Sequence, residues 1–258
     1  MTDPAAPVYP DLDGMSVFVT GGASGIGASL VQGFAAQGAK IAFCDLIDGT
    51  AHADAVEKAT GNRPLALTCD VTDTPAFRAA LDRAAEAHGP IATFVSNAAN
   101  DTRIRADDVT PEGWDSNLAL NLDAHFHGAQ HVAPMMRQIG GGSIIMFSSV
   151  TWFMGSADIV PYVTAKAGVV GMMRALAREW GGDMIRVNAI VPGWVFTERQ
   201  LRLWAKPEAV AAFLARQCLP VKLQPDDMVP PVLFLASSGA RMITGQCLPV
   251  DAGVVHTA

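Results

Sequence analysis

The chain has 258 residues, of which 50% are hydrophobic and 17% are charged, and its net charge is −7. This composition supplies a sizeable core and excludes extensive disorder, and the acidic balance argues against nucleic acid or an anionic membrane as a partner. No apolar run approaches the ~18 residues of a membrane span, and the N-terminus has no signal-like pattern. We therefore expect a soluble, cytoplasmic protein.

Short β-rich runs alternate with longer helical stretches, the pattern of parallel strands joined by crossover helices. We expect strands over residues 16–20, 40–45, 64–68, 91–97, 143–148, 185–191 and 247–250. Helices are expected from about 28 to 37, over 75–88, within 111–138, over 162–180 and from about 226 to 236. The strands are near-continuous apolar runs, as a sheet covered on both faces requires. The prediction is one α/β domain over 1–258, doubly wound around a seven-stranded parallel sheet. A tail over 1–10 precedes it, and a helical flap interrupts it at about 194–223.

A glycine-rich loop follows the first expected strand and opens a helix. Its glycines stand at positions 21, 25 and 27, a GxxxGxG spacing. Glycines permit a tight turn and a close backbone approach, and the helix N-terminus then directs free N–H groups at a pyrophosphate. We assign a dinucleotide phosphate to this loop, with Gly21, Ser24, Gly25, Ile26 and Gly27 as its contacts.

Asp45 ends the second expected strand, twenty residues after Gly25. An acid at this position hydrogen-bonds the adenine ribose hydroxyls and repels a 2′-phosphate. Residues 22–26 and 46–48 contain no Arg or Lys to accept that phosphate. The sequence therefore favours NAD over NADP, with Leu46 beside the ribose, although a solvated acid at a strand end is the alternative.

Tyr162 and Lys166 are four residues apart in an expected helix, so their side chains project from the same face. Tyrosine has an ordinary pKa near about 10, and a neighbouring ammonium favours its phenolate form. Such tuning suits a general base. Most Tyr-x-x-x-Lys pairs are helix surface neighbours, but here Ser148 and Ser149 lie just upstream and the glycine loop opens the chain.

Taken together, these motifs resemble the short-chain dehydrogenase/reductase family, and the likeness covers nearly the whole chain. The matching positions, all in family order, are the loop 21–27, Asp70, Val71, residues 96–99, Asn121, Ser149, Tyr162, Lys166, Pro192 and Gly193. Residues 96–99 read Ser-Asn-Ala-Ala where the family usually has Asn-Asn-Ala-Gly, which affects only the local turn. The resemblance implies a Rossmann-type fold.

The resemblance also implies a role for each catalytic position. Tyr162 is the general acid/base, and Lys166 lowers its pKa and binds the nicotinamide ribose. Ser149 hydrogen-bonds the reacting oxygen, while the competing Ser148 ends its strand. Asn121 holds a water that links Lys166 to solvent.

For the cofactor, the resemblance places Asp70 and Val71 at the adenine and Asn97 and Ala98 along the ribose. The nicotinamide half would be held by Pro192, Gly193, Val195 and Thr197.

The substrate wall is expected from the loops after the fourth, fifth and sixth strands. These loops supply Asn100, Asp101, Thr102 and Arg103, then Trp152 and Asp158, then Trp194 with Glu198, Arg199 and Gln200 just beyond, around Ser149 and Tyr162. Carboxylate, amide and guanidinium groups can hold vicinal hydroxyls, and an indole can cover an apolar sugar face. A steroid or an acyl chain would favour a more apolar wall.

The same loops resemble those of bacterial NAD-dependent aldose 1-dehydrogenases, which implies oxidation of a sugar at its anomeric carbon to a lactone. A 3-oxoacyl thioester or hydroxysteroid reductase of the same family is the alternative. A non-catalytic NAD-binding sensor is a third possibility, although such a protein would be expected to have lost Tyr162 or Lys166.

No metal site is expected. His125, His127 and His131 fall on one expected helix without an HExxH pattern or an acidic partner, so they are read as packing or interface residues. Four cysteines, Cys44, Cys69, Cys218 and Cys247, lack metal-ligand spacing and are expected to be reduced core residues. The resemblance further implies a homo-oligomer, a dimer or a tetramer.

Overall fold

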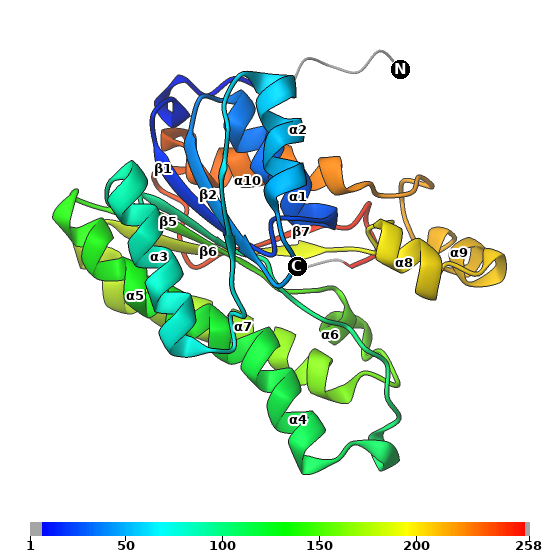
Figure 1. Ribbon diagram of the computed structural model, residues 1–258. Coiled ribbons are helices and arrows are strands. Elements are labelled where there is room, and N and C mark those ends of the chain that lie inside the picture. The colour runs from blue at the N-terminus through cyan, green and yellow to red at the C-terminus, as the bar shows by residue number, and fades with distance from the viewer. Residues whose placement is uncertain (1–6, 256–258) are drawn as a thin grey trace.

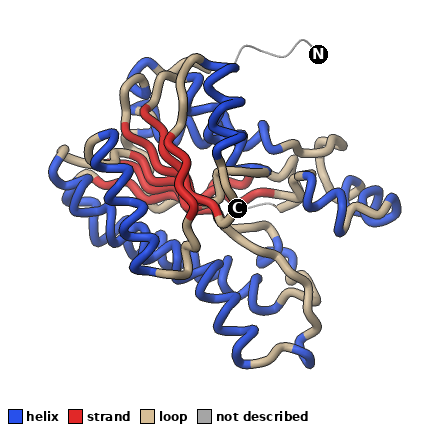
Figure 2. Tube along the Cα trace, viewed as in Figure 1, coloured by secondary structure: helices blue, strands red, loops and turns tan. Residues whose placement is uncertain are grey.

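Seven parallel strands form one sheet in the order β3-β2-β1-β4-β5-β6-β7 (Figures 1 and 2). The computed structural model describes residues 7–255. The strands are β1 (Ser16–Thr20), β2 (Lys40–Asp45), β3 (Leu65–Thr68), β4 (Thr93–Ser96), β5 (Gly142–Phe147), β6 (Ile185–Pro192) and β7 (Cys247–Val250). The predicted seven-stranded parallel sheet is confirmed, with strand ends shifted by a few residues at most.

Helices cover both faces of the sheet (Figure 1). One layer contains α3 (Thr74–His88), α4 (Pro111–Leu118), α5 (Ala124–Gln138) and α7 (Val160–Trp180), and the other contains α1 (Gly25–Ala36), α2 (Thr50–Thr60) and α10 (Val229–Ala236). Three short helices, α6 (Thr151–Met154), α8 (Glu198–Leu203) and α9 (Pro207–Leu214), lie beyond the carboxyl ends of the strands. Within residues 7–255, no helix is both long enough and apolar enough to cross a bilayer.

The two faces of the sheet bury separate sets of side chains. Phe18 and Phe94 point to the layer of α3, α5 and α7, where Phe77 packs against Phe94. On the other face, Val19 and Phe43 pack with the layer of α1, α2 and α10. Successive strand residues therefore both meet apolar neighbours, which explains the continuous apolar runs in the sequence.

Strand β1 pairs with β2 on one side and with β4 on the other, so the winding direction reverses at β1. The connections after these strands leave in opposite directions and open a crevice at their carboxyl ends, where ligands bind in sheets of this kind.

Four features differ from the sequence prediction or extend it. The helix α2 between β2 and β3 was not predicted. The long helix expected within 111–138 is divided by a π-helical segment, Ala119–Asp123, which separates α4 from α5. The predicted flap contains α8 and α9. Of the predicted tail, residues 1–6 lie outside the described residues, and Pro10–Leu12 forms a short 3₁₀ turn.

Candidate active site

A cavity of about 1090 Å³ lies at the carboxyl ends of the strands, and the loops after β1 to β6 contribute to its wall. Of the predicted cofactor contacts, it is lined by Gly21, Ser24, Gly25, Ile26, Asp45, Leu46, Asp70, Val71, Asn97, Ala98, Tyr162, Lys166, Pro192, Gly193, Val195 and Thr197. Of the predicted substrate contacts, it is lined by Asn100, Asp101, Arg103, Ser149, Tyr162, Trp194 and Gln200. Gly27, Asn121, Trp152 and Asp158 do not line it.

The glycine loop has the backbone geometry of a phosphate cradle. Gly21 and Gly25 have φ of +68° and +54°, a region that L side chains rarely adopt. Gly27 lies under the loop, because a Cβ there would stand 1.9 Å from the carbonyl oxygen of Gly21. Ser24 precedes α1 without capping it through its side chain, which leaves the N–H groups of the first turn available to a pyrophosphate.

Thr20 and Asn97 join the glycine loop to the loop after β4. The Thr20 hydroxyl accepts hydrogen bonds from the backbone N–H groups of Asn97 (2.9 Å) and Ala98 (3.0 Å). The Asn97 amide donates back to the Thr20 carbonyl at 3.0 Å. These bonds fix the predicted ribose wall against the phosphate loop. The supporting role of Thr20 was not anticipated from the sequence.

Asp45 points from the end of β2 into the glycine loop. Its Oδ2 accepts a hydrogen bond from the Ala23 N–H at 3.0 Å, and its Oδ1 accepts from the Ile47 N–H at 3.3 Å. These two bonds hold the carboxylate at the cavity wall, as a contact to ribose hydroxyls requires.

Tyr162 and Lys166 lie together at the start of α7, but their ionisation differs from the prediction. The Lys166 Nζ lies 5.7 Å from the centre of the Tyr162 ring and donates a hydrogen bond to the Phe147 carbonyl at 2.9 Å. Burial lowers the pKa of Lys166 to about 7, so its positive charge is weakened. Burial, followed by the charge of Asp101, raises the pKa of Tyr162. The pKa of Tyr162 is therefore raised in this structure, whereas the sequence analysis expected it to be lowered.

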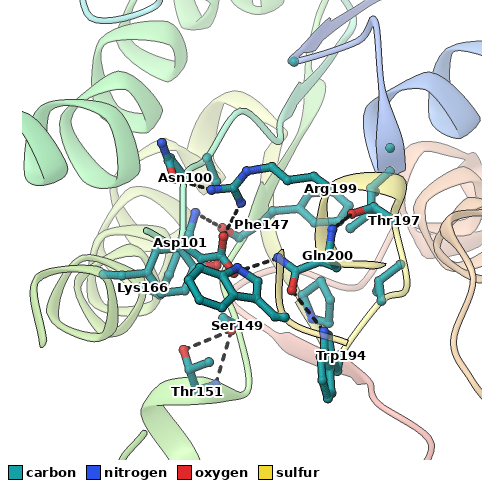
Figure 3. Close-up of a pocket in the computed structure, with 18 of the residues that line it drawn as sticks. Asn100, Asp101, Phe147, Ser149, Thr151, Lys166, Trp194, Thr197, Arg199 and Gln200 are labelled. Atoms are coloured by element: carbon teal, nitrogen blue, oxygen red, sulfur yellow. Dashed lines mark hydrogen bonds and ion pairs between the residues drawn. The ribbon is translucent and has the colours of Figure 1, made fainter. Parts of the chain in front are cut away.

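The two neighbouring serines have separate functions. A hydrogen bond between Ser149 and the Tyr162 phenol lowers the pKa of Tyr162. Ser149 also accepts from the Thr151 hydroxyl at 3.0 Å (Figure 3). Ser148 donates to the Lys166 carbonyl at 2.7 Å and accepts from the Trp152 indole N–H at 3.2 Å. The assignment of Ser149 to the reacting position agrees with this geometry.

Trp152 and Asp158, both predicted for the substrate wall, do not line the cavity in this structure. The indole of Trp152 turns inward, bonds to Ser148 and stacks on Phe153 with ring centres 3.7 Å apart. Asp158 adopts a positive φ of 62°, and its carbonyl accepts from the Ile104 N–H.

Asn121 is fully buried in the π-helical segment. Its amide accepts from the Asn100 N–H and donates to the Asn100 carbonyl, each at 3.0 Å, and it also donates to Asn117. Its side chain therefore holds the loop after β4. The proton relay through Asn121 remains a prediction.

Polar side chains from the loop after β4 and from the flap meet in one network beside Ser149 (Figure 3). Arg199 forms an ion pair with Asp101 and donates to the Asn100 carboxamide oxygen at 2.8 Å. Gln200 donates to Asp101 at 2.7 Å and accepts from the Trp194 indole N–H at 3.0 Å. We call these five residues the polar roof. The sequence analysis named all five among the polar residues of these loops, although it did not assign Arg199 a substrate contact.

The comparison with known proteins agrees with this geometry. A family model described as "Enoyl-(Acyl carrier protein) reductase" matches residues 21–255. The chain is 45% identical to the probable galactose dehydrogenase GalD of Rhizobium meliloti (strain 1021), over 98% of this chain and 100% of that protein. It is 44% identical to a D-xylose 1-dehydrogenase of Caulobacter vibrioides, over 96% and 99% respectively. The chain belongs to the short-chain dehydrogenase/reductase family. It is an oxidoreductase that uses a nicotinamide cofactor.

A solved structure of the same family has the same fold. The crystal structure of a proposed NAD(P)-dependent gluconate 5-dehydrogenase from Beutenbergia cavernae, with NADP bound at low occupancy, has a TM-score of 0.89 and 34% identity. The match covers 94% of this chain and 97% of that one.

Further cavity residues of this short-chain dehydrogenase come mainly from the flap, and the sequence analysis did not predict them. The Arg103 guanidinium lies 4.3 Å from the centre of the Trp204 ring, a second contact between the loop after β4 and the flap. Other unpredicted lining residues include Val150, Met154, Ile159, Arg202, Phe213 and Arg216. Because the flap carries no family motif, only its length and its position after β6 could have indicated them.

The cysteines and histidines agree only in part with the prediction. All four cysteines are free, and Cys44 and Cys69 are buried, but Cys218 is exposed in the loop after α9. Its assignment to the core is wrong, because the apolar residues beside it are also exposed or half-buried. Within residues 7–255, no group of three His, Cys, Asp or Glu side chains could hold a metal. His131 instead pairs with Asp82 at 2.7 Å.

Proposed function

We propose that the protein is an NAD-dependent aldose 1-dehydrogenase, which oxidises the anomeric carbon of a sugar to a lactone. The polar roof beside Ser149 and Tyr162 carries this proposal, because its carboxylate, guanidinium, amide and indole groups match the hydroxyls and the apolar face of a sugar. The names of the two relatives, a galactose and a xylose dehydrogenase, support the same substrate class.

The residues of the site divide the reaction between them. When bound, the nicotinamide supplies the hydride acceptor. Tyr162 takes the hydroxyl proton as the anomeric carbon loses its hydride, and Ser149 orients the reacting oxygen. Tyr162 needs nearby positive charge to act as a base, since its pKa is raised in this structure. Lys166 and Arg199 are the side chains placed to provide it.

The residues of the polar roof are hydrogen-bonded to one another. A bound sugar would therefore replace some of these bonds with bonds to its own hydroxyls. Asp101 uses one carboxylate oxygen for Arg199 and the other for Gln200. A substrate hydroxyl that inserts between Asp101 and Gln200 donates to the carboxylate and accepts from the amide, so that two hydrogen bonds, one of them charge-assisted, replace one. This exchange favours ligands with neighbouring hydroxyls over ligands with a single alcohol.

We propose NAD as the cofactor, supported by the position of Asp45 at the cavity wall. The neighbouring wall residues Leu46 and Ile47 carry no positive charge for a 2′-phosphate. The four cavity arginines, Arg103, Arg199, Arg202 and Arg216, come from the loop after β4 and from the flap region.

The proposal is tested by mixing the purified protein with NAD or NADP and a panel of pentoses and hexoses while NADH absorbance is recorded. We expect turnover of at least one aldose with NAD and formation of the corresponding lactone. Tyr162→Phe should abolish turnover and leave NAD affinity nearly unchanged. The chain has only two tyrosines, so Tyr9→Phe is a matched control that should retain activity.

The apolar part of the cavity supports a second candidate, reduction of a 3-oxoacyl thioester or a hydroxysteroid. Val150, Met154, Ile159 and Phe213 line the cavity, and the family model carries a reductase description. Silence on every sugar together with turnover of such a substrate would replace the aldose proposal. Binding of NAD without turnover of any substrate would favour a sensor.

We also propose a cytoplasmic homo-oligomer, a dimer or a tetramer. The four free thiols support a reducing compartment, and the exposed side chains of Phe126 and Val160 support contacts between subunits. Light scattering of the purified protein measures the mass directly, and fractionation of the source cells locates it. A monomer, or a secreted protein, would contradict these proposals.

A further inference from the structure

His125 is a buried titratable side chain beside the active site that has no role in the reaction described above. It lies on the first turn of α5 and is fully shielded from solvent. Its Nε2 lies 3.3 Å from the Nζ of Lys166, although the two residues are 41 positions apart in the chain.

The hydrogen bonds of Lys166 define what this contact does. An ammonium group has three N–H donors and no acceptor. One donor is used by the Phe147 carbonyl at 2.9 Å, and the second points to His125. The third remains for the cavity that Lys166 lines. His125 therefore helps to fix the direction of the Lys166 amine.

His125 is neutral, so its Nε2 can accept a hydrogen bond from Lys166. Burial, together with the nearby Lys166, lowers the pKa of His125 well below its usual range, so the imidazole is neutral. In a neutral imidazole one nitrogen donates and the other accepts. Acceptance at Nε2 places the proton on Nδ1.

Packing alone does not account for a histidine at this position. Its Nδ1 is buried and has no hydrogen-bond partner among the described residues. An unpartnered buried polar atom destabilises the fold, and a leucine would fill similar space without that penalty. A favourable contact elsewhere on the ring must offset the penalty, and Nε2 has one, with Lys166.

We propose that His125 is a positioning residue, which accepts a hydrogen bond from Lys166 and keeps its ammonium charged and directed towards Tyr162. The proposal rests on the catalytic roles proposed for Tyr162 and Lys166. His125 itself does not line the cavity. Its effect therefore reaches the reaction only through Lys166.

The other ionisable groups facing this pair can be named. Tyr162 lies on the same helix as Lys166, Asp101 faces Tyr162 from the loop after β4, and Arg199 faces it from α8. Strand β5 contributes the uncharged Phe147 carbonyl. From α5, His125 contacts Lys166.

The test replaces His125 by Leu, which removes the acceptor, and by Gln, which retains one. Loss of the acceptor destabilises the ammonium, so the pKa of Lys166 falls by about one unit. With less positive charge nearby, the pKa of Tyr162 rises. We expect the acidic limb of the kcat–pH profile for sugar oxidation to move to higher pH by up to about one unit in His125→Leu, with KM for the sugar unchanged. His125→Gln should resemble the wild type.

A second readout does not depend on activity. The chain has five lysines, so Cε resonances of 13C-lysine-labelled protein can be resolved, and the Lys166 signal can be assigned with Lys166→Met. Its titration midpoint should fall in His125→Leu. His127→Leu on the same helix is the matched control and should leave the midpoint unchanged. If His125→Leu fails to fold, His125→Asn, whose amide is too short to reach Nζ, replaces it.

Two failures remain distinguishable. If Tyr162→Phe is inactive but His125→Leu keeps both the wild-type pH profile and the wild-type lysine titration, His125 is a packing residue and our inference is overturned. If the wild type oxidises no aldose, the proposed function fails, and the lysine titration still decides the role of His125.

Discussion

The two members of the ion pair between Asp101 and Arg199 shift the pKa of Tyr162 in opposite directions, so replacing each of them should have opposite effects on the reaction. Asp101 raises the pKa of Tyr162 and Arg199 lowers it. Asp101→Asn should therefore make the phenol a base at lower pH. Arg199→Met should require higher pH for the same step.

The size of the effect follows from the exposure of the pair. A charge within about 4–6 Å shifts a pKa by about 1–3 units when it is shielded from water. The side chains of Asp101 and Arg199 are 23% and 38% exposed, so solvent screens both. We expect shifts of about half a unit to one unit for each variant, in opposite directions.

The assay is the pH dependence of kcat for sugar oxidation at saturating NAD, because kcat reports ionisation in the bound complex. KM for the sugar should rise in both variants, since both residues belong to the polar roof. Arg137→Met is the matched control, because Arg137 pairs with Asp183 at 2.6 Å at the far end of α5. It should leave the acidic limb unmoved. Shifts of Asp101→Asn and Arg199→Met in the same direction would refute the electrostatic reasoning.

Three further changes probe other parts of the site. Asp45→Ser removes the carboxylate proposed to face the ribose, so NAD affinity should fall about tenfold or more and discrimination against NADP should weaken. Fluorescence titration with each nucleotide measures both effects. Unchanged discrimination would contradict the NAD assignment. Gly27→Ala places a Cβ 1.9 Å from the carbonyl oxygen of Gly21 and should abolish NAD binding. Gly171→Ala is the control, because its added Cβ meets nothing within 4 Å. This variant should bind NAD normally and unfold at a slightly higher temperature. Trp152→Phe should lower the free energy of unfolding by about 1 kcal/mol, through the lost hydrogen bond to Ser148, and leave KM for the sugar unchanged; a large rise in KM would restore Trp152 to the substrate wall.

The sequence predicted those features that local periodicity determines. Buried strands appear as apolar runs, so all seven were located. The spacing of Tyr162 and Lys166 placed both on one helical face, and the glycine spacing located the phosphate loop. By contrast, α2 buries only Ala53 and Val56, so it has no apolar stripe that a sequence pattern could reveal.

The features that the sequence did not predict, such as the surroundings of Lys166 and the orientation of Trp152, depend on tertiary contacts. The Lys166 side chain is long enough to reach the Phe147 carbonyl and His125, and neither contact follows from a spacing of four residues. Burial of this side chain, which the spacing also does not reveal, lowers the pKa of Lys166 and weakens its charge beside the phenol. In the same way, a four-residue helix turns the Trp152 indole inward, which no local signal indicates.

The π-helical turn that carries Asn121 has a consequence for how such enzymes diversify. Because the Asn121 amide holds the Asn100 backbone through two hydrogen bonds, the helical layer fixes the start of the neighbouring loop. The Asn100 side chain adds a local turn by accepting from the Thr102 N–H. Positions 101 and 103 can therefore change without redirecting the main chain. Divergence in sugar preference can then proceed one side chain at a time on a fixed scaffold.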